Sequence, residues 1–244
     1  MSVLVYGPSQ GTENERLPAI FYIHGGGYVA GSADLYDNEH HEAATKLHCV
    51  VVAVDYRLAP ENPYPTPLND CVSGITWVYD NAEQLGIDRE RITVMGESAG
   101  GGLTASLCHY LRDKTKITPR NQVMLFPMLD YKTSANPAEV KNKYAGEYVW
   151  THDVNDFGWK YLLGEKRWRI LKFNITRRRT RRVSRICHPL TLQSAASICC
   201  STKVSSMPRS SVVLAYRFRW RWWLALFTDS TSSPVKQRKS SMRD

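Results

Sequence analysis

Residues 91–101 read Arg-Ile-Thr-Val-Met-Gly-Glu-Ser-Ala-Gly-Gly, and this segment indicates the type of fold. The β-branched residues of Arg91–Met95 predict a strand, and Ala99–Tyr110 predicts a helix. Between them lies a G-x-S-x-G motif, Gly96–Gly100, in which the serine occupies a sharp strand-to-helix turn that exposes its hydroxyl. The sequence therefore predicts a strand, a tight turn with Ser98 at its apex, and a helix.

A second glycine-rich motif, His24-Gly25-Gly26-Gly27, directly follows the apolar run Leu17–Ile23. Glycine lets backbone N–H groups approach a developing negative charge closely, as an oxyanion hole requires. Alone, each motif could be an ordinary glycine-rich turn with an incidental serine or a flexible loop. Together they favour a serine nucleophile that faces an oxyanion hole, with the residue after the serine supplying a further N–H.

Strands and helices alternate along residues 1–164, which predicts a mostly parallel sheet with right-handed crossovers. The continuous apolar run Cys49–Val54 is typical of a strand buried on both faces. The expected strands are Val3–Tyr6, Leu17–Ile23, Cys49–Val54, Arg91–Met95 and Gln122–Phe126, and the expected helices are Asn38–Leu47, Pro67–Asn81 and Ala99–Tyr110. The helical residues expected to face inward are Ala43, Ala44, Leu47, Leu68, Val72, Ile75 and Val78.

The composition changes abruptly near Gly164–Glu165. Residues 1–164 hold 13 Lys and Arg against 20 Asp and Glu, whereas residues 165–244 hold 19 against three. All 15 glycines lie at or before Gly164, so the later part lacks the residue that tight turns favour most. We expect a partial α/β domain over 1–164 that lacks its last strands, followed by a disordered or poorly packed Arg/Ser/Trp-rich basic tail over 165–244.

Several features bear on location and ligands. There is no run of 18 apolar residues, and the N-terminus lacks a charged region followed by a long apolar run, so we expect neither a membrane span nor a signal peptide. The cysteines show neither metal-ligand spacing nor disulfide density, which favours the cytoplasm and no metal site. Serine hydrolysis needs no cofactor, and none is expected. The six cysteines are Cys49, Cys71, Cys108, Cys187, Cys199 and Cys200.

A serine nucleophile also needs a general base, and in this type of fold the acid and the histidine follow the serine in that order. No histidine follows a late strand, so each is expected to be a surface or helix-capping residue. Asp130 follows the strand after the serine turn, which is early for the acid. A triad acid and base are therefore not identifiable. The histidines considered are His40, His41, His48, His109, His152 and His188.

Four motifs follow one another along the chain: His24–Tyr28, Asp55–Glu61, Gly96–Gly101 and Phe126–Asp130. By these motifs, residues 1–164 resemble the hormone-sensitive-lipase-like family of α/β-hydrolases, which includes carboxylesterases and arylacetamide-deacetylase-like enzymes. The segment Tyr148–Gly164 is similar to part of the family's cap. The resemblance implies an α/β-hydrolase fold, with a mostly parallel sheet flanked by helices, and esterase or lipase-like hydrolysis of a small-molecule carboxylic ester. It also implies a structural role for Asp55–Glu61, with Arg57 in buried ion pairs.

The resemblance also assigns the site residues by position. It implies that Ser98 is the nucleophile. The backbone around the oxyanion hole is then that of Gly25, Gly26, Gly27 and Ala99, and the supporting motif residues are His24, Gly96, Glu97 and Gly100.

Two departures from the family pattern stand out. The chain that usually precedes the first strand and helps form the cap is absent, and so are the late Asp-x-x-x-Asp-Glu-Gly segment and the final His-Gly pair. If Ser197–Val204 and Leu226–Ser230 are back-translated with G or C in third positions and read one base earlier, Asp-Glu-Gly and His-Gly patterns become available. One base of each shifted codon is a free choice, so a single match is weak. Two matches in order and in one frame favour a tail translated out of frame.

Two functions from different classes follow. The first is a serine carboxylic ester hydrolase that is catalytically impaired because its triad acid and base are missing. The alternative is a non-catalytic hydrolase-fold protein whose basic tail binds nucleic acid or an acidic membrane in a salt-sensitive way. Arginine runs are weak motifs, so we assign no specific nucleic acid. The sequence sets neither the oligomeric state nor the natural ester.

Overall fold

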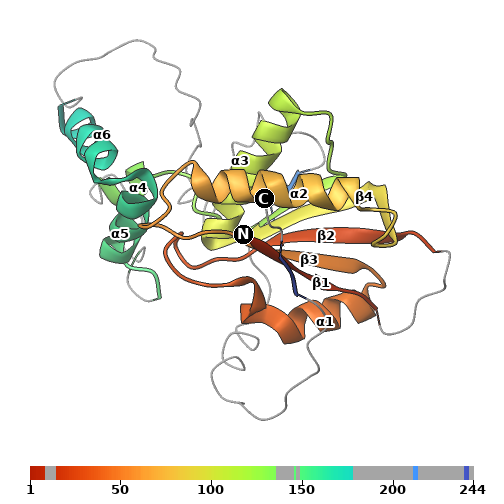
Figure 1. The fold of residues 1–244 in the computed structure, drawn as a ribbon. Helices are drawn as coiled ribbons and strands as arrows, with labels where there is room; N and C mark the ends of the chain where they lie inside the picture. Colours follow the sequence, from red (N-terminus) through yellow and green to blue (C-terminus); the bar gives the residue numbers. More distant parts are fainter. Residues whose placement is uncertain (9–14, 136–145, 147–148, 178–210, 214–238, 242–244) are drawn as a thin grey trace.

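The computed structural model describes residues 1–8, 15–135, 146, 149–177, 211–213 and 239–241. A central sheet carries helices on both faces, and three further helices gather at one end of it (Figure 1). The strands are β1 Ser2–Tyr6, β2 Leu17–Ile23, β3 Val50–Asp55, β4 Ile87–Glu97, β5 Asn121–Leu125, β6 Ser211–Val213 and β7 Lys239–Ser241. The helices are the 3-10 helix η1 Ala33–Tyr36, α1 Asp37–Lys46, α2 Thr66–Asp80, α3 Ser98–Lys114, α4 Lys132–Ala135, α5 His152–Leu163 and α6 Glu165–Arg177.

The sheet is mostly parallel, which confirms the expected α/β architecture. Its strand order is β6-β5-β4-β2-β3-β1-β7, and the pairs among β2, β3, β4 and β5 are all parallel. β1 pairs antiparallel with β3. The three-residue strands β6 and β7 extend the two edges, β6 parallel to β5 and β7 antiparallel to β1.

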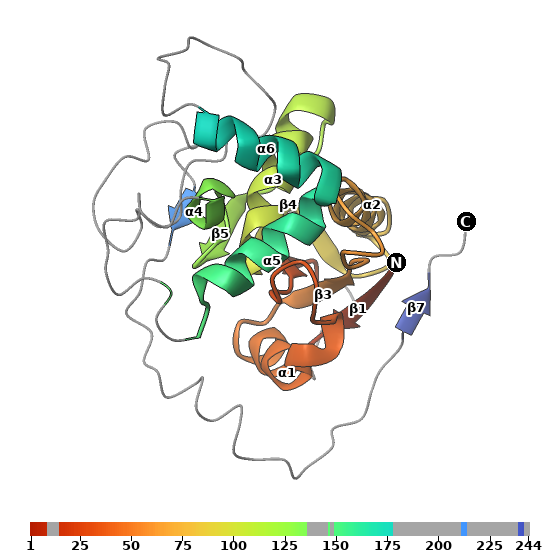
Figure 2. The same ribbon diagram turned by 90° about the vertical axis from the view of Figure 1, so that its left-hand side faces the viewer.

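The middle of the sheet is buried on both faces, as the apolar run in β3 predicts. Val50, Val52 and Val54 belong to the larger core, which includes residues of α2 and α3. Val51 and Ala53 belong to the smaller core, which includes a residue of α1. Figures 1 and 2 show α1 on one face and α2 and α3 on the other. The sheet is therefore held between two apolar layers.

The first helix differs from the prediction at its end. α1 buries Ala44 but stops at Lys46, and Leu47 lies beyond it as the C-cap with 62% of its surface exposed. The expectation that Leu47 faces inward is wrong, because the helix ends before this residue can join its buried face. In α2 the expected stripe is found, with Leu68, Ile75 and Val78 buried and Val72 partly buried against the core.

β4 and α3 are longer than the sequence indicates. β4 begins at Ile87 and pairs with β2 across a register shift between Leu17 and Ala19. The intervening Pro18 has no N–H to donate to a strand ladder, which accounts for the irregularity. α3 continues four residues past Tyr110 to Lys114, and this last turn adds the buried Leu111 to the core before it ends in three charged residues.

One helix, α6, extends the packed unit past the change of composition at Gly164. Trp159 of α5 is buried, and so is Trp168 of α6, whose ring centroid lies 6.2 Å from that of Tyr131. Figure 2 shows α5 and α6 side by side over the end of the sheet. The basic segment therefore begins as a helix that packs at least as far as Leu171.

Beyond residue 177 the structure describes only β6 and β7. The expectations that fall on the arginines at 178–182, the Trp-rich stretch at 217–223, the stretches read in a shifted frame, His188, Cys187, Cys199 and Cys200 therefore lie outside the described residues. Within the described residues, no helix combines the length and the apolar character that a bilayer span requires.

Candidate active site

Ser98 lies where β4 turns directly into α3. Its φ of 51° falls in the left-handed region, which a non-glycine residue occupies at an energetic cost. The turn places Ser98 at the positive end of the α3 dipole. Ala99 is the next residue of the helix, and its N–H is one of the first four, which have no acceptor within the helix. The turn therefore carries a strained serine beside backbone donors that have no acceptor within the helix.

The glycine loop leaves β2 in an unusual backbone conformation and returns to the serine turn. Gly26, Gly27 and Tyr28 have consecutive positive φ values of 104°, 63° and 70°. Two later N–H groups donate to the Gly26 carbonyl at 3.1 and 3.0 Å and close the loop. A β carbon on Gly25 would lie 3.4 Å from Ser98 Cβ. The structure thus brings the two sequence motifs into contact.

The motif glycines allow backbone segments to approach more closely than a side chain would permit. A β carbon on Gly100 would lie 2.0 Å from the Ile23 carbonyl oxygen, and one on Gly96 would lie 2.4 Å from the Gly100 carbonyl oxygen. α3 therefore packs directly on the end of β2, where the glycine loop begins. Backbone contact sets the spacing between that loop and Ser98.

His24 holds the glycine loop from its buried side. Its ring stacks on Tyr56 with centroids 4.2 Å apart, and the Tyr56 hydroxyl donates to the His24 carbonyl at 3.0 Å. His24 Nδ1 lies 2.8 Å from the Gly25 carbonyl oxygen. Burial lowers the pKa of His24, which favours a neutral ring whose Nδ1–H donates to that carbonyl. This geometry gives His24 a positioning role rather than that of a base.

Glu97, the residue before the serine, connects the turn to the opposite face of the sheet. The Tyr36 hydroxyl at the end of η1 donates to Glu97 Oε1. The same oxygen would lie 3.4 Å from a β carbon on Gly25. Burial raises the pKa of the Glu97 carboxyl. Glu97 therefore links the serine turn, the glycine loop and η1.

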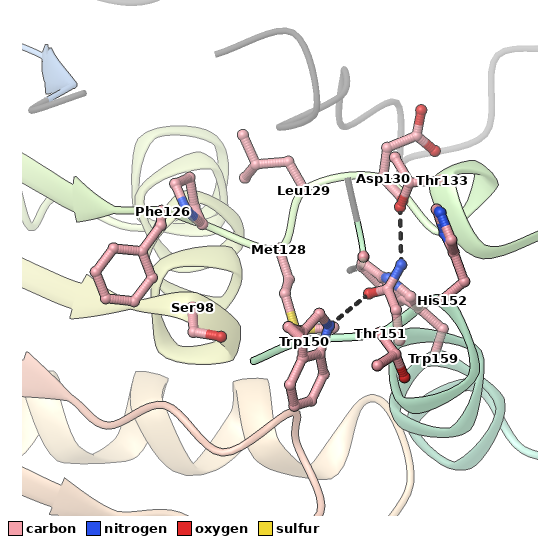
Figure 3. Close-up of a pocket in the computed structure, with 13 residues that line it drawn as sticks. Ser98, Phe126, Met128, Leu129, Asp130, Thr133, Trp150, Thr151, His152 and Trp159 are labelled. Carbon is pink, nitrogen blue, oxygen red and sulfur yellow. Dashed lines mark hydrogen bonds between the residues drawn. The ribbon is translucent and has the colours of Figure 1, made fainter. Parts of the chain in front are cut away.

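A cavity of about 290 Å³ opens at Ser98 (Figure 3). Its walls come from the serine turn, from the segment after β5 together with α4, and from α5 together with the segment that leads into it. Phe126 lies on one side of Ser98 and Trp150 on the other (Figure 3). A mostly apolar pocket with a few polar groups is typical of small-molecule sites. The lining residues are Ser98, Phe126, Pro127, Met128, Leu129, Asp130, Thr133, Gly146, Trp150, Thr151, His152, Asn155 and Trp159.

Two residues that the sequence does not assign to a triad, Asp130 and His152, line this cavity. Asp130 accepts the Lys132 N–H at 2.9 Å, and burial raises the pKa of its carboxyl. His152 begins α5, and Figure 3 shows Trp150 between it and Ser98. Among the described residues, the Ser98 hydroxyl has no hydrogen-bond partner. The pocket therefore holds an aspartate and a histidine that are not joined to the serine as a triad.

The remaining described histidines lie away from the cavity. His40 is buried, which corrects the expectation of a surface residue, because α1 packs it against aromatic rings of the sheet. Its ring centroid lies 4.5 Å from that of Tyr22 and 5.1 Å from that of Tyr6, and burial lowers its pKa to about 4. His48 and His109 are exposed, as expected.

The segment Asp55–Glu61 ties β3 to α2. Arg57 donates from Nε and Nη2 to the Asp70 carboxylate at 3.0 and 2.8 Å, and its backbone N–H donates to the same carboxylate at 2.9 Å. Asp70 is buried, but the Arg57 side chain is 53% exposed. The expected buried ion pair is therefore buried on its acidic side alone, because the guanidinium lies at the surface.

The sequence does not predict Phe126 and Trp150 as wall residues of the cavity. Phe126 ends the expected strand but leaves β5 with a φ of 35° and 59% exposure. No local pattern places Trp150 beside Ser98, because the contact joins segments far apart in the chain. In the sequence, the similarity of Tyr148–Gly164 to a cap segment is the one feature that indicates a position near the site for Trp150.

Comparison with known proteins agrees with this geometry. Residues 20–202 match the family model described as the alpha/beta hydrolase fold. The chain belongs to this alpha/beta hydrolase family. The matched range includes both glycine motifs and runs past the change of composition at Gly164.

Similar proteins within the alpha/beta hydrolase family are named as esterases. An arylesterase of Saccharolobus solfataricus is 36% identical over 171 residues, which are 68% of this chain and 53% of the relative. An ethyl acetate hydrolase of Pseudomonas putida is 39% identical over 131 residues, 53% of this chain and 41% of the relative. The structure of a bacterial heroin esterase matches with a TM-score of 0.56 and 34% identity, covering 67% of this chain and 54% of that one. The chain thus spans about half the length of these relatives.

Proposed function

We propose that Ser98 and the glycine loop are the nucleophile and the oxyanion-hole part of a carboxylic ester hydrolase site for a small-molecule ester. One observation carries this proposal: the strained Ser98 turn touches Gly25 of the loop at the mouth of an apolar cavity. Esterase relatives support the substrate class.

The chemistry follows from this arrangement. The Ser98 oxygen attacks the acyl carbon, and negative charge develops on the carbonyl oxygen. The N–H groups of Gly25, Gly26, Gly27 and Ala99 are the candidate donors to that oxygen. Collapse of the tetrahedral intermediate releases the alcohol, and water then hydrolyses the acyl-serine to the acid. Each stage needs a group that accepts the hydroxyl or water proton and returns it to the leaving oxygen.

We further propose that turnover by this chain is impaired because it lacks the group that accepts and returns this proton. The sequence lacks the family's late acid and histidine patterns, and the described residues leave the Ser98 hydroxyl without a hydrogen bond to a histidine. Loss of a triad member lowers kcat by several orders of magnitude, while the oxyanion hole and binding alone retain about 10³- to 10⁴-fold catalysis over water.

Hydrolysis of p-nitrophenyl acetate by the purified full chain tests both parts. We expect a slow rate that still falls on Ser98→Ala substitution. A kcat within the ordinary range of about 1–10³ s⁻¹ would refute the impairment. A slow rate identical in Ser98→Ala would refute the role of Ser98.

We propose that residues 165–244 are translated out of frame, on the basis of the missing glycines and the two shifted-frame patterns. Sequencing an independent clone across codons 150–244 tests this directly. If an adjacent frame continues into Asp-Glu-Gly and His-Gly, the frame proposal stands. If no frame does so, it falls.

The alternative function rests on the charge of the same residues, 19 Lys and Arg against three Asp and Glu. Such a polycation binds nucleic acid or acidic lipid with an affinity that falls steeply with salt. Electrophoretic mobility shifts of the full chain with single-stranded DNA at two salt concentrations would detect this. Absence of a shift at low salt would exclude nucleic-acid binding of this kind. The cysteine usage supports a cytoplasmic location, which fractionation would check.

A further inference from the structure

Trp150 lies directly against the glycine loop. A β carbon on Gly27 would lie 2.3 Å from Cη2 of the indole and 3.1 Å from its Cζ2. The outer edge of the ring therefore contacts the backbone that supplies the proposed oxyanion donors. In Figure 3 the same ring stands beside Ser98. A substrate carbonyl that is bound in the hole thus has the indole as its neighbour.

A chain of hydrogen bonds fixes this ring. Trp150 Nε1 donates to Asn155 Oδ1 at 3.1 Å, and Asn155 Nδ2 donates to Thr133 Oγ1 at 3.0 Å. The Thr133 hydroxyl donates to the Asp130 carbonyl at 2.7 Å. The ring is therefore anchored to α5 and, through α4, to the segment after β5. Such anchoring stops the indole from swinging away to admit a longer group.

The backbone of α5 also lies against the glycine loop. A β carbon on Gly158 would lie 2.7 Å from the Gly27 carbonyl oxygen, so the helix itself packs on the glycine loop. Gly27 is thus flanked by Trp150 and by the Gly158 turn of α5. The loop and the indole wall form one packed unit.

We propose that Trp150 is a specificity-determining residue that limits the site to esters with a short group on the Gly27 side of the carbonyl. The proposal rests on the proposed function of Ser98. The cavity volume of about 290 Å³ lies at the small end of ligand pockets, which span about 300–1,000 Å³. A longer chain on this side meets the indole before it reaches open solvent.

Binding of ethylboronic and octylboronic acid to the full chain tests this without requiring turnover. Boron accepts the Ser98 oxygen, the hydroxyl proton passes to the buffer, and a tetrahedral borate forms at the oxyanion hole. Calorimetry gives the affinities, and boron NMR reports whether the tetrahedral adduct forms. The variants are Trp150→Ala, Trp150→Leu, which keeps an apolar side chain, and Ser98→Ala. The matched control is Phe157→Ala, an aromatic truncation on α5 at a half-exposed residue outside the cavity.

We expect the unmodified chain to bind the ethyl compound at least tenfold more tightly than the octyl compound. Trp150→Ala should tighten octyl binding at least tenfold and change ethyl binding less than threefold. Trp150→Leu should shift the preference in the same direction, and Phe157→Ala should preserve it. No length preference in the unmodified chain, or an unchanged preference in a folded Trp150 variant, would overturn the proposal.

The two proposals fail in different ways. An adduct that forms with no length preference leaves the function of Ser98 standing and removes the role of Trp150. Binding without a tetrahedral adduct, unaffected by Ser98→Ala, removes the function of Ser98. In that case a length preference that depends on Trp150 still supports the proposal that Trp150 limits the length of the bound group.

Discussion

Gly100→Ala is expected to destabilise the protein although it lies inside a helix. In an exposed helix interior, alanine is favoured over glycine by about 0.8–1.0 kcal/mol. Here the new methyl group would lie 2.0 Å from the Ile23 carbonyl oxygen and 2.4 Å from that of His24. Ordinary contact begins at 3.4 Å, so α3 and the end of β2 must separate by more than an ångström.

Because both clashing atoms belong to the backbone, neither can rotate away. Overpacking of this kind costs about 1–3 kcal/mol and occasionally more, which exceeds the gain in helix propensity. We therefore expect the free energy of unfolding to fall by about 1–3 kcal/mol. For a chain of this size each kcal/mol corresponds to roughly 2–4 °C in Tm. The same displacement separates Ser98 from the glycine loop, so boronic acid binding should weaken as well.

Urea unfolding followed by circular dichroism measures this change. Gly7→Ala is the control, because a β carbon on Gly7 would have no atom within 4 Å. Gly7→Ala should leave the midpoint almost unchanged. A Gly100→Ala variant as stable as the parent, or more stable, would refute the argument from backbone contact.

Two further perturbations test the packing around the site. Asp70→Ala removes a buried carboxylate that accepts three hydrogen bonds from Arg57, and the free energy of unfolding should fall by about 1–3 kcal/mol, since water can solvate the half-exposed guanidinium. The exposed pair of Asp88 and Arg91 provides the control, and its loss in Asp88→Ala should have little effect on the urea midpoint. For His40, burial lowers the pKa from 6.5 to about 4, so the unfolded chain binds the proton more readily than the folded one. Stability should therefore fall as the pH drops from 6.5 towards 4, by up to roughly 3 kcal/mol, and His40→Phe should flatten this dependence. If the free energy of unfolding of His40→Phe depends on pH as steeply as that of the parent, His40 is not the cause of the dependence.

The core elements could be predicted because their patterns are local. The apolar run of β3 already implied burial on two faces, and β2 was located to the residue. The serine turn could be predicted because the motif glycines report close backbone approaches, which Gly96 and Gly100 do make. Element ends were less predictable, as Leu47 shows, because the end of a helix depends on where the chain turns rather than on periodicity.

The walls of the cavity could not be predicted from local patterns. Trp150 is held in the cavity wall by hydrogen bonds that join α5, α4 and the segment after β5. The burial of His40 likewise depends on the rings of Tyr6 and Tyr22, which come from separate strands. Such contacts arise when distant segments fold together, and neither spacing nor composition encodes them.

We propose that this chain holds the nucleophile and oxyanion hole of an ester hydrolase and lacks the groups that complete catalysis. To test this, p-nitrophenyl acetate hydrolysis by the chain as it stands is compared with that by a version whose reading frame is shifted by one base after codon 164. We expect the frame-shifted version to be at least about 10³-fold faster, because a triad member contributes several orders of magnitude, and we expect Ser98→Ala to abolish the gain. A frame-shifted chain that is no faster, or an original chain that already hydrolyses the ester at ordinary enzyme rates, would contradict it.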